Sequence, residues 1–389
     1  MLVRHSTRRD RIAVSLAFAV VGFLLAVWLV HIPAVQISTG ISHSELGLTL
    51  LGLGLGSFVA MQLAGALVAR LGARRPLLLG LLVMALSLLA PAMAIDGWTL
   101  GVALFAFGVG NGICEVSMNA EAVEVEREHG RPIMSSFHAF FSVGTALGAA
   151  FGGAFLAVGM GSLIDFVLAA MIGIGVALLS FTMLTDRSHV AEEEIELDQA
   201  ARGSQTGRVV LLAVLAFVLM LAEGIANDWS VLHAVEHREA TDASGAAAYG
   251  TFAVTMTIGR LLVDRVAARF GPVAVVRWGS LIAAAGLLLV MTLPGLAGAL
   301  VGWAVFAIGL AGVVPQIFTA AGNMPVRRRA VMIARVVGAG YIGLLAGPAV
   351  IGWIADATDL NSALLLPVAL CLFGVIGASA VKPDRMPVA

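Results

Sequence analysis

The sequence carries little charge for its length. Asp, Glu, Lys and Arg make up 12% of its 389 residues, against about 25% in an average soluble domain. Hydrophobic residues make up 60%, and the mean hydropathy is +0.99. Because one soluble core cannot bury this much apolar sequence, the composition predicts a polytopic α-helical membrane protein.

Other absences exclude whole classes of protein. There are only two cysteines, Cys114 and Cys371, and both fall in apolar runs, so no disulfide framework is indicated. A net charge of −1 offers no basic surface for nucleic acid. The sequence has no phosphate-cradling loop, metal-ligand cluster or nucleophile elbow. We therefore expect no enzyme, no cofactor, no metal site and no ATP-driven transport.

What the chain does have is a series of apolar runs, each near the roughly 20 residues that a membrane span needs. The first run follows four arginines and is longer than a signal-peptide core, so we interpret it as a retained span. The predicted spans are 12–34, 46–69, 76–95, 98–120, 133–158, 162–184, 209–232, 244–266, 272–293, 296–320, 330–354 and 361–381. A count of eleven or thirteen remains open at this point.

The spans fall into two halves around one polar stretch. Residues 1–185 form the N-terminal half, 186–207 an acidic cytoplasmic linker, and 208–389 the C-terminal half. With the N-terminus inside, only Arg238 of the 23 Lys and Arg residues lies in an outer loop. Positive residues favour the cytoplasmic side, so both termini are predicted to be cytoplasmic.

The halves repeat a glycine pattern and a tryptophan position. Trp28 and Trp229 lie near the outer ends of the first and seventh spans. Glycines recur on one face of the fifth and eleventh spans, at Gly144, Gly148 and Gly152 and at Gly343 and Gly347. We therefore predict an all-α fold of twelve transmembrane helices in two pseudo-symmetric six-helix bundles.

A polar stripe interrupts the fourth span. Asn111, Glu115 and Asn119 are spaced i, i+4, i+8, which places them on one helix face. An ionisable side chain at bilayer depth costs roughly 3 kcal/mol, so it indicates a functional cavity by default. Glu115 is a candidate proton carrier; the alternative is a structural acid that pairs with Arg335. Asn111 and Asn119 are candidates for holding substrate.

The seventh span repeats the acid–amide spacing. Glu223 and Asn227 again stand four residues apart, with Asp228 and Trp229 directly after them. Glu223 is the competing proton carrier. Asn227 and Asp228 are cavity candidates, and each tryptophan (Trp28 and Trp229) is either a membrane anchor or a cavity wall.

Single polar residues elsewhere are weaker candidates. His31 and His138 could relay protons, although a lone histidine near a helix end is more often structural. Gln62 and Gln316 could bond substrate or only a neighbouring helix. Arg260, near the end of its span, is predicted to snorkel toward the cytoplasm.

The segment between the second and third spans, GALVARLGARR at residues 65–75, resembles the G-x-L-x-D-R-x-G-x-R signature of the major facilitator superfamily. The resemblance implies that Gly65, Arg70, Gly72 and Arg74 belong to a cytoplasmic gate. The usual acid is replaced by Ala69. The second half keeps an acid in its matching segment, where the candidates are Gly259, Arg260, Asp264 and Arg265.

The resemblance covers the whole chain and implies a secondary active transporter in a bacterial inner membrane, working by alternating access. The spans around Glu115 and Glu223 look similar to a branch akin to the fucose permease. The expected partners are a small organic solute, protons and the lipid bilayer, and the expected state is a monomer. Residues 148–153 resemble an antiporter signature, so a drug or metabolite exporter is the alternative; a non-transporting sensor is a third reading.

Overall fold

The computed structural model describes residues 2–129, 133–159, 161–186, 206–322, 324 and 329–382. Within these ranges all regular structure is helical, and 12 segments are long and apolar enough to cross a membrane. The predicted all-α class and the count of twelve are confirmed. The contacts divide the chain into two units: unit 1 is Met1–Glu192 with Thr241–Gly250, and unit 2 is Glu193–Ala240 with Thr251–Ala389. The predicted linker lies, apart from its ends, outside the described residues.

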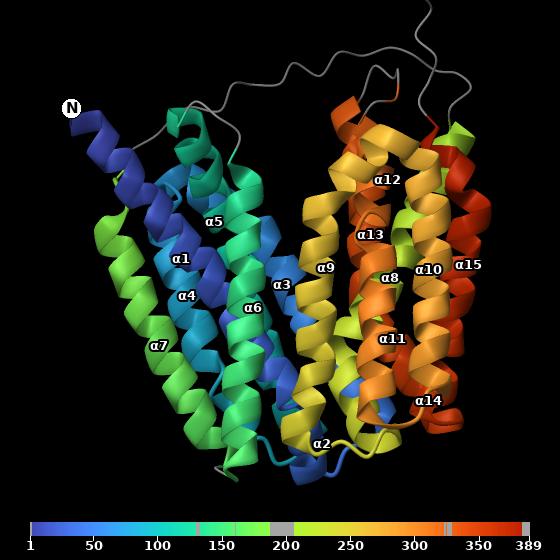
Figure 1. The fold of residues 1–389 in the computed structure, drawn as a ribbon. Coiled ribbons are helices and arrows are strands. Elements are labelled where there is room, and N and C mark those ends of the chain that lie inside the picture. The colour runs from blue at the N-terminus through green and yellow to red at the C-terminus, as the bar shows by residue number, and fades with distance from the viewer. Residues whose placement is uncertain are drawn as a thin grey trace, which may run out of the picture. The chain divides into compact units, whose positions relative to one another are not determined.

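Each unit is a bundle of long helices that run up and down side by side (Figure 1). The elements before the linker are α1 (Leu2–Val30), α2 (Ile32–Thr39), α3 (His43–Leu71), α4 (Arg74–Ser87), η1 (Ala90–Met93), α5 (Gly97–His129), α6 (Met134–Ala157) and α7 (Ser162–Met183). Those after it are α8 (Thr206–His237), α9 (Asp242–Phe270), α10 (Pro272–Thr292), α11 (Gly295–Leu310), α12 (Val313–Gly322), α13 (Arg329–Ala357), α14 (Leu360–Ala363), α15 (Leu365–Gly377) and η2 (Ala378–Val381).

The two units pair their spans in the same way. In unit 1 the first span, α1, packs on the fifth and sixth, α6 and α7. In unit 2 the corresponding first span, α8, packs on α13 and α15, which belong to its fifth and sixth spans. The predicted pseudo-symmetric pair of bundles is therefore confirmed.

The predicted glycine faces lie where these helices come closest. A Cβ at Gly144 or Gly148 would collide with the backbone of α1, at the carbonyls of Ala19 and Phe23. At Gly152 it would meet the side chains of Val30 and His31. In unit 2, Cβ atoms at Gly343 and Gly347 would meet the carbonyls of Phe217 and Leu221 on α8. Small residues thus let the first and fifth spans of each unit approach to backbone contact.

The charged stretch after the fourth span differs from the prediction. The fourth span was predicted to end at residue 120, but α5 continues as helix through His129. Glu, Ala and Arg are good helix formers, so the segment extends the helix until Gly130 and Pro132 are reached. Glu121, on this extension, is buried with 2% exposure.

Arginines stabilise the helix ends in both units. In unit 1, Arg74 Nε donates to the Phe181 carbonyl at 2.9 Å near the end of α7, and its guanidinium lies 4.1 Å from the Phe181 ring. In unit 2, Arg208 Nε donates to the Ala380 carbonyl at 2.9 Å. These bonds satisfy carbonyls that lack a partner in the last helical turn.

Arg238, the one basic residue predicted outside, has a structural explanation. Its Nη2 donates to the carbonyls of Val290 at 2.7 Å and Met291 at 2.6 Å, and to Asn361 Oδ1 at 2.9 Å. The guanidinium therefore caps the C-terminal end of α10. Partial burial lowers its pKa from the usual value, yet an arginine remains charged at any physiological pH.

Candidate functional site

The stripe predicted in the fourth span lies on α5, with Glu115 past the middle of the helix. Glu115 is half-buried. Asn119 Nδ2 donates to the Glu115 backbone carbonyl at 2.7 Å and lies 3.2 Å from Glu115 Oε2. Among the described residues of unit 1, Glu115 pairs with no arginine, lysine or histidine. The carboxyl group therefore has an amide neighbour and, among the described side chains of its unit, no counter-charge.

Asn111 is directed elsewhere. Its Nδ2 donates to Ser57 Oγ on α3 at 2.9 Å, and that hydroxyl donates to the Gly108 carbonyl at 2.9 Å. A Cβ at Gly112 would collide with the Ser57 backbone. The asparagine thus connects α3 to α5 at a close helix crossing, and only Glu115 and Asn119 of the stripe contact each other.

The acid–amide pair of the seventh span lies on α8. Glu223 Oε1 accepts a 2.7 Å bond from Arg260 Nη2 on α9. The Glu223 side chain is 15% exposed and that of Arg260 is 49% exposed. Asn227 Nδ2 donates to the Glu223 carbonyl at 3.1 Å. The guanidinium of Arg260 thus reaches across from α9 to α8.

The residues that follow this pair are half-buried or fully buried. Asp228 is half-buried. Trp229 and its counterpart Trp28 are fully buried at 0% exposure. Both indoles thus belong to the helix core of their units in this structure, with no surface toward lipid or an open cavity.

The predicted gate residues lie at the α3–α4 junction and late in α9. Gly72 ends α3 with φ 71°, a left-handed conformation that favours glycine. A Cβ at Gly259 would lie 2.6 Å from the Ala311 Cβ, whereas Gly65 has open space. Arg70 and Arg265 are exposed. The side chain of Asp264 lies outside the described residues.

The remaining single candidates are scattered. Gln62 is exposed on α3, and Gln316 is half-buried on α12. His138 is exposed on α6, with its ring centroid 5.1 Å from that of Phe18. The described contacts bring neither glutamine to Glu115 or to Glu223.

Two buried histidine contacts were not predicted from the sequence, although one of the two histidines was named there. His31 Nε2 lies 2.8 Å from Asp165 Oδ2, and both side chains have 0% exposure. In unit 2, His233 Nε2 lies 3.0 Å from Asn361 Oδ1. Asp165 carries the signal that singled out Glu115, an acid inside an apolar span, and should have been found. Only His31 was named.

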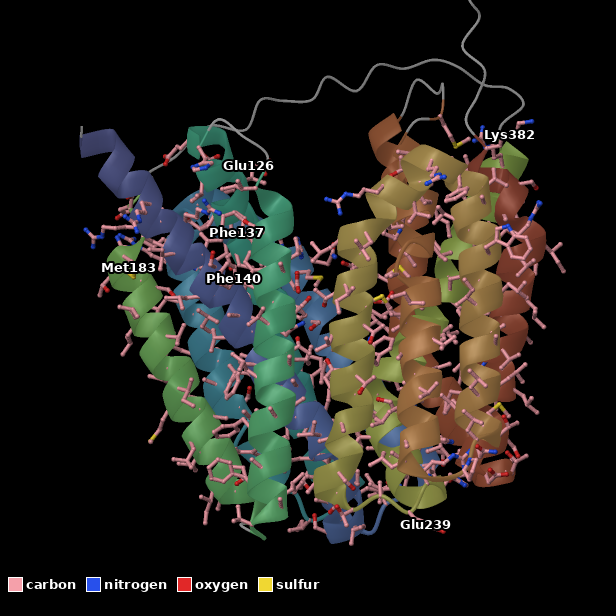
Figure 2. The ribbon with its side chains drawn as sticks, in the orientation of Figure 1. Glu126, Phe137, Phe140, Met183, Glu239 and Lys382 are labelled. Atoms are coloured by element: carbon pink, nitrogen blue, oxygen red, sulfur yellow. The ribbon has the colours of Figure 1, made fainter. Side chains whose placement is uncertain are left out.

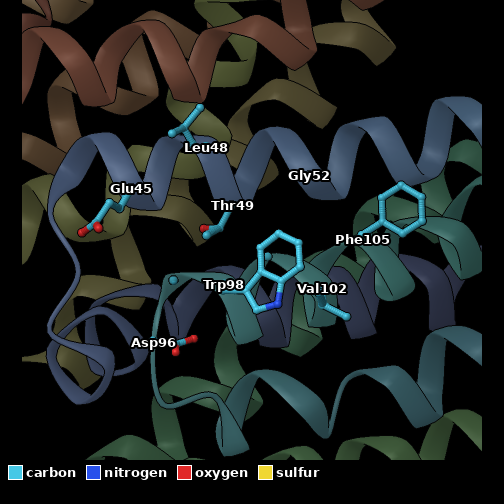
Figure 3. Close-up of a pocket in the computed structure, with 10 residues that line it drawn as sticks. Glu45, Leu48, Thr49, Gly52, Asp96, Trp98, Val102 and Phe105 are labelled. Atoms are coloured by element: carbon cyan, nitrogen blue, oxygen red, sulfur yellow. The ribbon is translucent and has the colours of Figure 1, made fainter.

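A groove of about 690 Å³ lies at one end of α3 and α5 (Figure 3). Its wall is largely apolar, with Leu48 from α3 and Trp98 and Phe105 from α5. Its two carboxylates already serve as helix caps. Glu45 accepts from the Ser42 N–H at 2.9 Å, and Asp96 accepts from the Thr99 N–H at 2.8 Å.

The bonds from Thr99, backbone first, lower the pKa of Asp96 from its usual value. Asp96 therefore stays ionised at neutral pH and does not suit proton exchange. No group of three or more His, Cys, Asp or Glu side chains that could hold a metal occurs in the part of the chain that the structure describes.

Twelve apolar spans in two helical bundles, with ionisable groups midway along two of the helices, define a polytopic α-helical membrane protein. Residues 11–324 match the model of the Major Facilitator Superfamily. The chain belongs to this superfamily, whose members are membrane transporters and not enzymes.

Named relatives agree with this assignment. An uncharacterised MFS-type transporter of Yersinia pestis is 34% identical over 96% of both chains, and the membrane protein MosC of Rhizobium meliloti is 31% identical over 95% of this chain and 88% of its own. The solved fucose:proton symporter FucP of E. coli shares the fold at a TM-score of 0.60 and 19% identity, over 96% of this chain and 98% of its own. A bacterial inner-membrane, multi-pass protein fits these matches.

Proposed function

We propose that this chain is a proton-coupled secondary transporter of a small organic solute that works by alternating access as a monomer. The observation that carries the proposal is Glu115, a half-buried acid in a membrane span for which the described part of its unit offers no counter-charge. An isolated negative charge is costly at that depth, and protonation is the least costly way to neutralise it. Glu115 is thus suited to load and release a proton as its surroundings change.

Glu223 suits a different role. Its charge is already balanced by Arg260 at 2.7 Å, so protonation would leave the arginine unpaired. Arg260 is half-exposed within an apolar span, and an arginine there is expected to face water or substrate and not lipid. We assign Glu223 and Arg260 to solute binding, with Asn227 and Asp228 beside them.

Breaking this pair should impair transport, and removing both charges should restore part of it. We expect Arg260→Gln to raise the KM for the solute by roughly tenfold, because it leaves the Glu223 carboxylate unpaired. Glu223→Gln should also raise the KM, because it leaves the Arg260 guanidinium unpaired. The double variant should lose less transport than the sum of the losses in the two single variants. The double-mutant cycle would be calculated from KM and Vmax measured by uptake into liposomes.

A solute must first be identified. Purified protein in liposomes should move protons when the correct solute is added, and the screen would cover sugars, nucleosides, amino acids and cationic drugs. Movement of protons and solute in the same direction favours a symporter. Movement in opposite directions favours the exporter alternative. Absence of proton movement with a solute that is transported would remove the coupling from the proposal.

We also propose that both termini are cytoplasmic. Figure 2 shows Glu239 at the end of unit 2 opposite Lys382. The exposed arginines Arg265 and Arg269 end α9, whereas Arg238, at the Glu239 end, is occupied as a helix cap. The free positive charge thus gathers at one end, which the positive-inside tendency assigns to the cytoplasm.

Cysteine labelling tests this orientation. The native Cys114 and Cys371 are buried, so we expect little labelling of the wild-type protein. We expect Glu239→Cys to react with a membrane-impermeant maleimide in intact cells, because the residue is exposed at the end that we propose to be outside. The matched control Ala268→Cys, exposed at the other end of α9, should react only after the membrane is permeabilised. The reverse pattern would invert the topology.

A further inference from the structure

The first span of unit 1 is interrupted at a titratable residue. α1 ends at Val30 and α2 begins at Ile32, with Pro33 in its first turn. Proline has no N–H to continue the ladder of helix hydrogen bonds. His31 stands at this break, fully buried, and faces Asp165 in the first turn of α7.

The contacts of His31 determine how many protons it holds. Nδ1 lies 2.7 Å from the Val27 carbonyl oxygen, which can only accept, so Nδ1 carries a hydrogen. Nε2 lies 2.8 Å from Asp165 Oδ2. That contact is a hydrogen bond only if one more proton lies between the two atoms, on either side. Without it, two lone pairs would face each other at that distance.

The other oxygen of Asp165 favours the neutral form of the pair. Oδ1 is buried and has no hydrogen-bond partner among the described residues. A carboxylate oxygen left unpaired in a protein interior is costly, whereas the carbonyl oxygen of a protonated acid is less so. A proton on Oδ2 that is donated to a neutral imidazole satisfies both contacts of the ring and leaves no net charge.

Unit 2 has a similar contact without the titratable acid. His233, near the end of α8, lies 3.0 Å from Asn361 in α14, at the start of the last span. An amide oxygen accepts from a neutral imidazole and releases no proton in the physiological range. Each unit therefore fastens its first span to its last through a histidine, but only unit 1 uses an exchangeable proton to do so.

We propose that His31 and Asp165 form a single-proton binding site that holds the α1–α2 break against the first turn of α7. The other groups that contact the imidazole from neighbouring elements are Phe166 on α7, at 4.7 Å between rings, and Gly152 on α6. Neither of them titrates, and Asp165 interacts with no other described charged group. The site is separate from Glu115 and does not rest on the proposed transport function.

The sign of the pH effect follows from counting protons. In the unfolded chain an aspartate titrates near about 3.9 and a histidine near about 6.5. Above about pH 6.5 the unfolded groups share no proton, whereas the folded pair still holds one. The folded state binds more protons there, so its stability falls as pH rises, by up to roughly tenfold in the folding equilibrium per pH unit. This loss continues until the folded pair releases its proton.

The test is the thermal unfolding midpoint of the purified full chain in detergent between about pH 5.5 and about pH 8.5. Asp165→Asn installs the amide of unit 2, which can donate to a neutral His31 at every pH in this range. We expect the wild type's advantage over Asp165→Asn to shrink steadily as pH rises. The comparison variant Asn361→Ala, which removes the acceptor of both His233 and Arg238, should lower the midpoint by an amount that does not change with pH. A constant difference between wild type and Asp165→Asn would overturn the proposal.

Hydrogen exchange on the wild type gives a second measurement that needs no variant to fold. We expect amides of α2, corrected for intrinsic exchange, to open at least about tenfold more often at the upper end of the range than at the lower end. Amides of α14, held by the His233–Asn361 contact, should not respond. Equal behaviour of α2 and α14 would show that no proton is stored at His31 and Asp165.

Discussion

Glu115→Gln is expected to abolish proton-driven accumulation or extrusion of the solute while exchange of solute across the membrane remains measurable. Glutamine keeps the size of the side chain and its contact with Asn119, but it cannot lose a proton. A carrier locked in the neutral form still changes conformation with solute bound and can no longer couple that change to a pH gradient. The measurement is uptake into proteoliposomes with and without an imposed gradient, beside counterflow.

The control for this variant lies on the same helix. Glu128 is exposed near the end of α5, so Glu128→Gln removes an equal charge outside the span and should leave gradient-driven transport near that of wild type. If Glu115→Gln also keeps full gradient-driven transport, Glu115 is a structural acid. The same two assays would then be applied to Glu223→Gln.

Gly144→Leu is expected to prevent unit 1 from folding. A Cβ at this position would overlap the Ala19 backbone of α1, and a backbone atom cannot rotate away as a side chain can. Overpacking costs typically 1–3 kcal/mol even where side chains can yield, so we expect a loss of about 3 kcal/mol or more. The amount of monodisperse protein after extraction, and its unfolding midpoint, would report the effect.

Gly175 provides the matched control for that substitution. It lies in α7, also a membrane span of unit 1, and a Cβ there meets nothing within 4 Å. Gly175→Leu should therefore extract normally and unfold within about 1 kcal/mol of wild type, since leucine is the better helix former. Equal damage from both variants would mean that the cost is general to these helices and not specific to the α1–α6 contact.

Hydropathy, charge and spacing were sufficient to predict the architecture. The seventh span was predicted as 209–232 and α8 runs over Thr206–His237; the ninth was predicted as 272–293 and α10 is Pro272–Thr292. Such agreement is expected because the bilayer imposes one length and one composition on every span. The positions of Glu115 and Asn119 on a shared helix face also follow from the 3.6-residue period alone.

Contacts between helices could not be obtained in this way. Arg260 and Glu223 are 37 residues apart, and His31 and Asp165 are 134 apart. Periodicity fixes which face of a helix a residue occupies, but not which neighbour that face meets. Arg238 was counted as an exception to the charge rule because the sequence does not show that the α10 carbonyls lie beside it.

The pairing of α1 with α6 and α7 has a consequence for how the protein is made. When α1 leaves the ribosome, the glycine face of its partner has not yet been translated, and neither has the acid that meets His31. The surface of nascent α1 that meets α6 and α7 therefore stays uncovered, in the membrane or beside the insertion machinery, while the next three spans are synthesised. The second half repeats this delay with α8 and α13. Biogenesis of each half is thus completed only when its final spans arrive, and a ribosome stalled between α5 and α6 would leave a chain that insertion factors or membrane proteases can still bind.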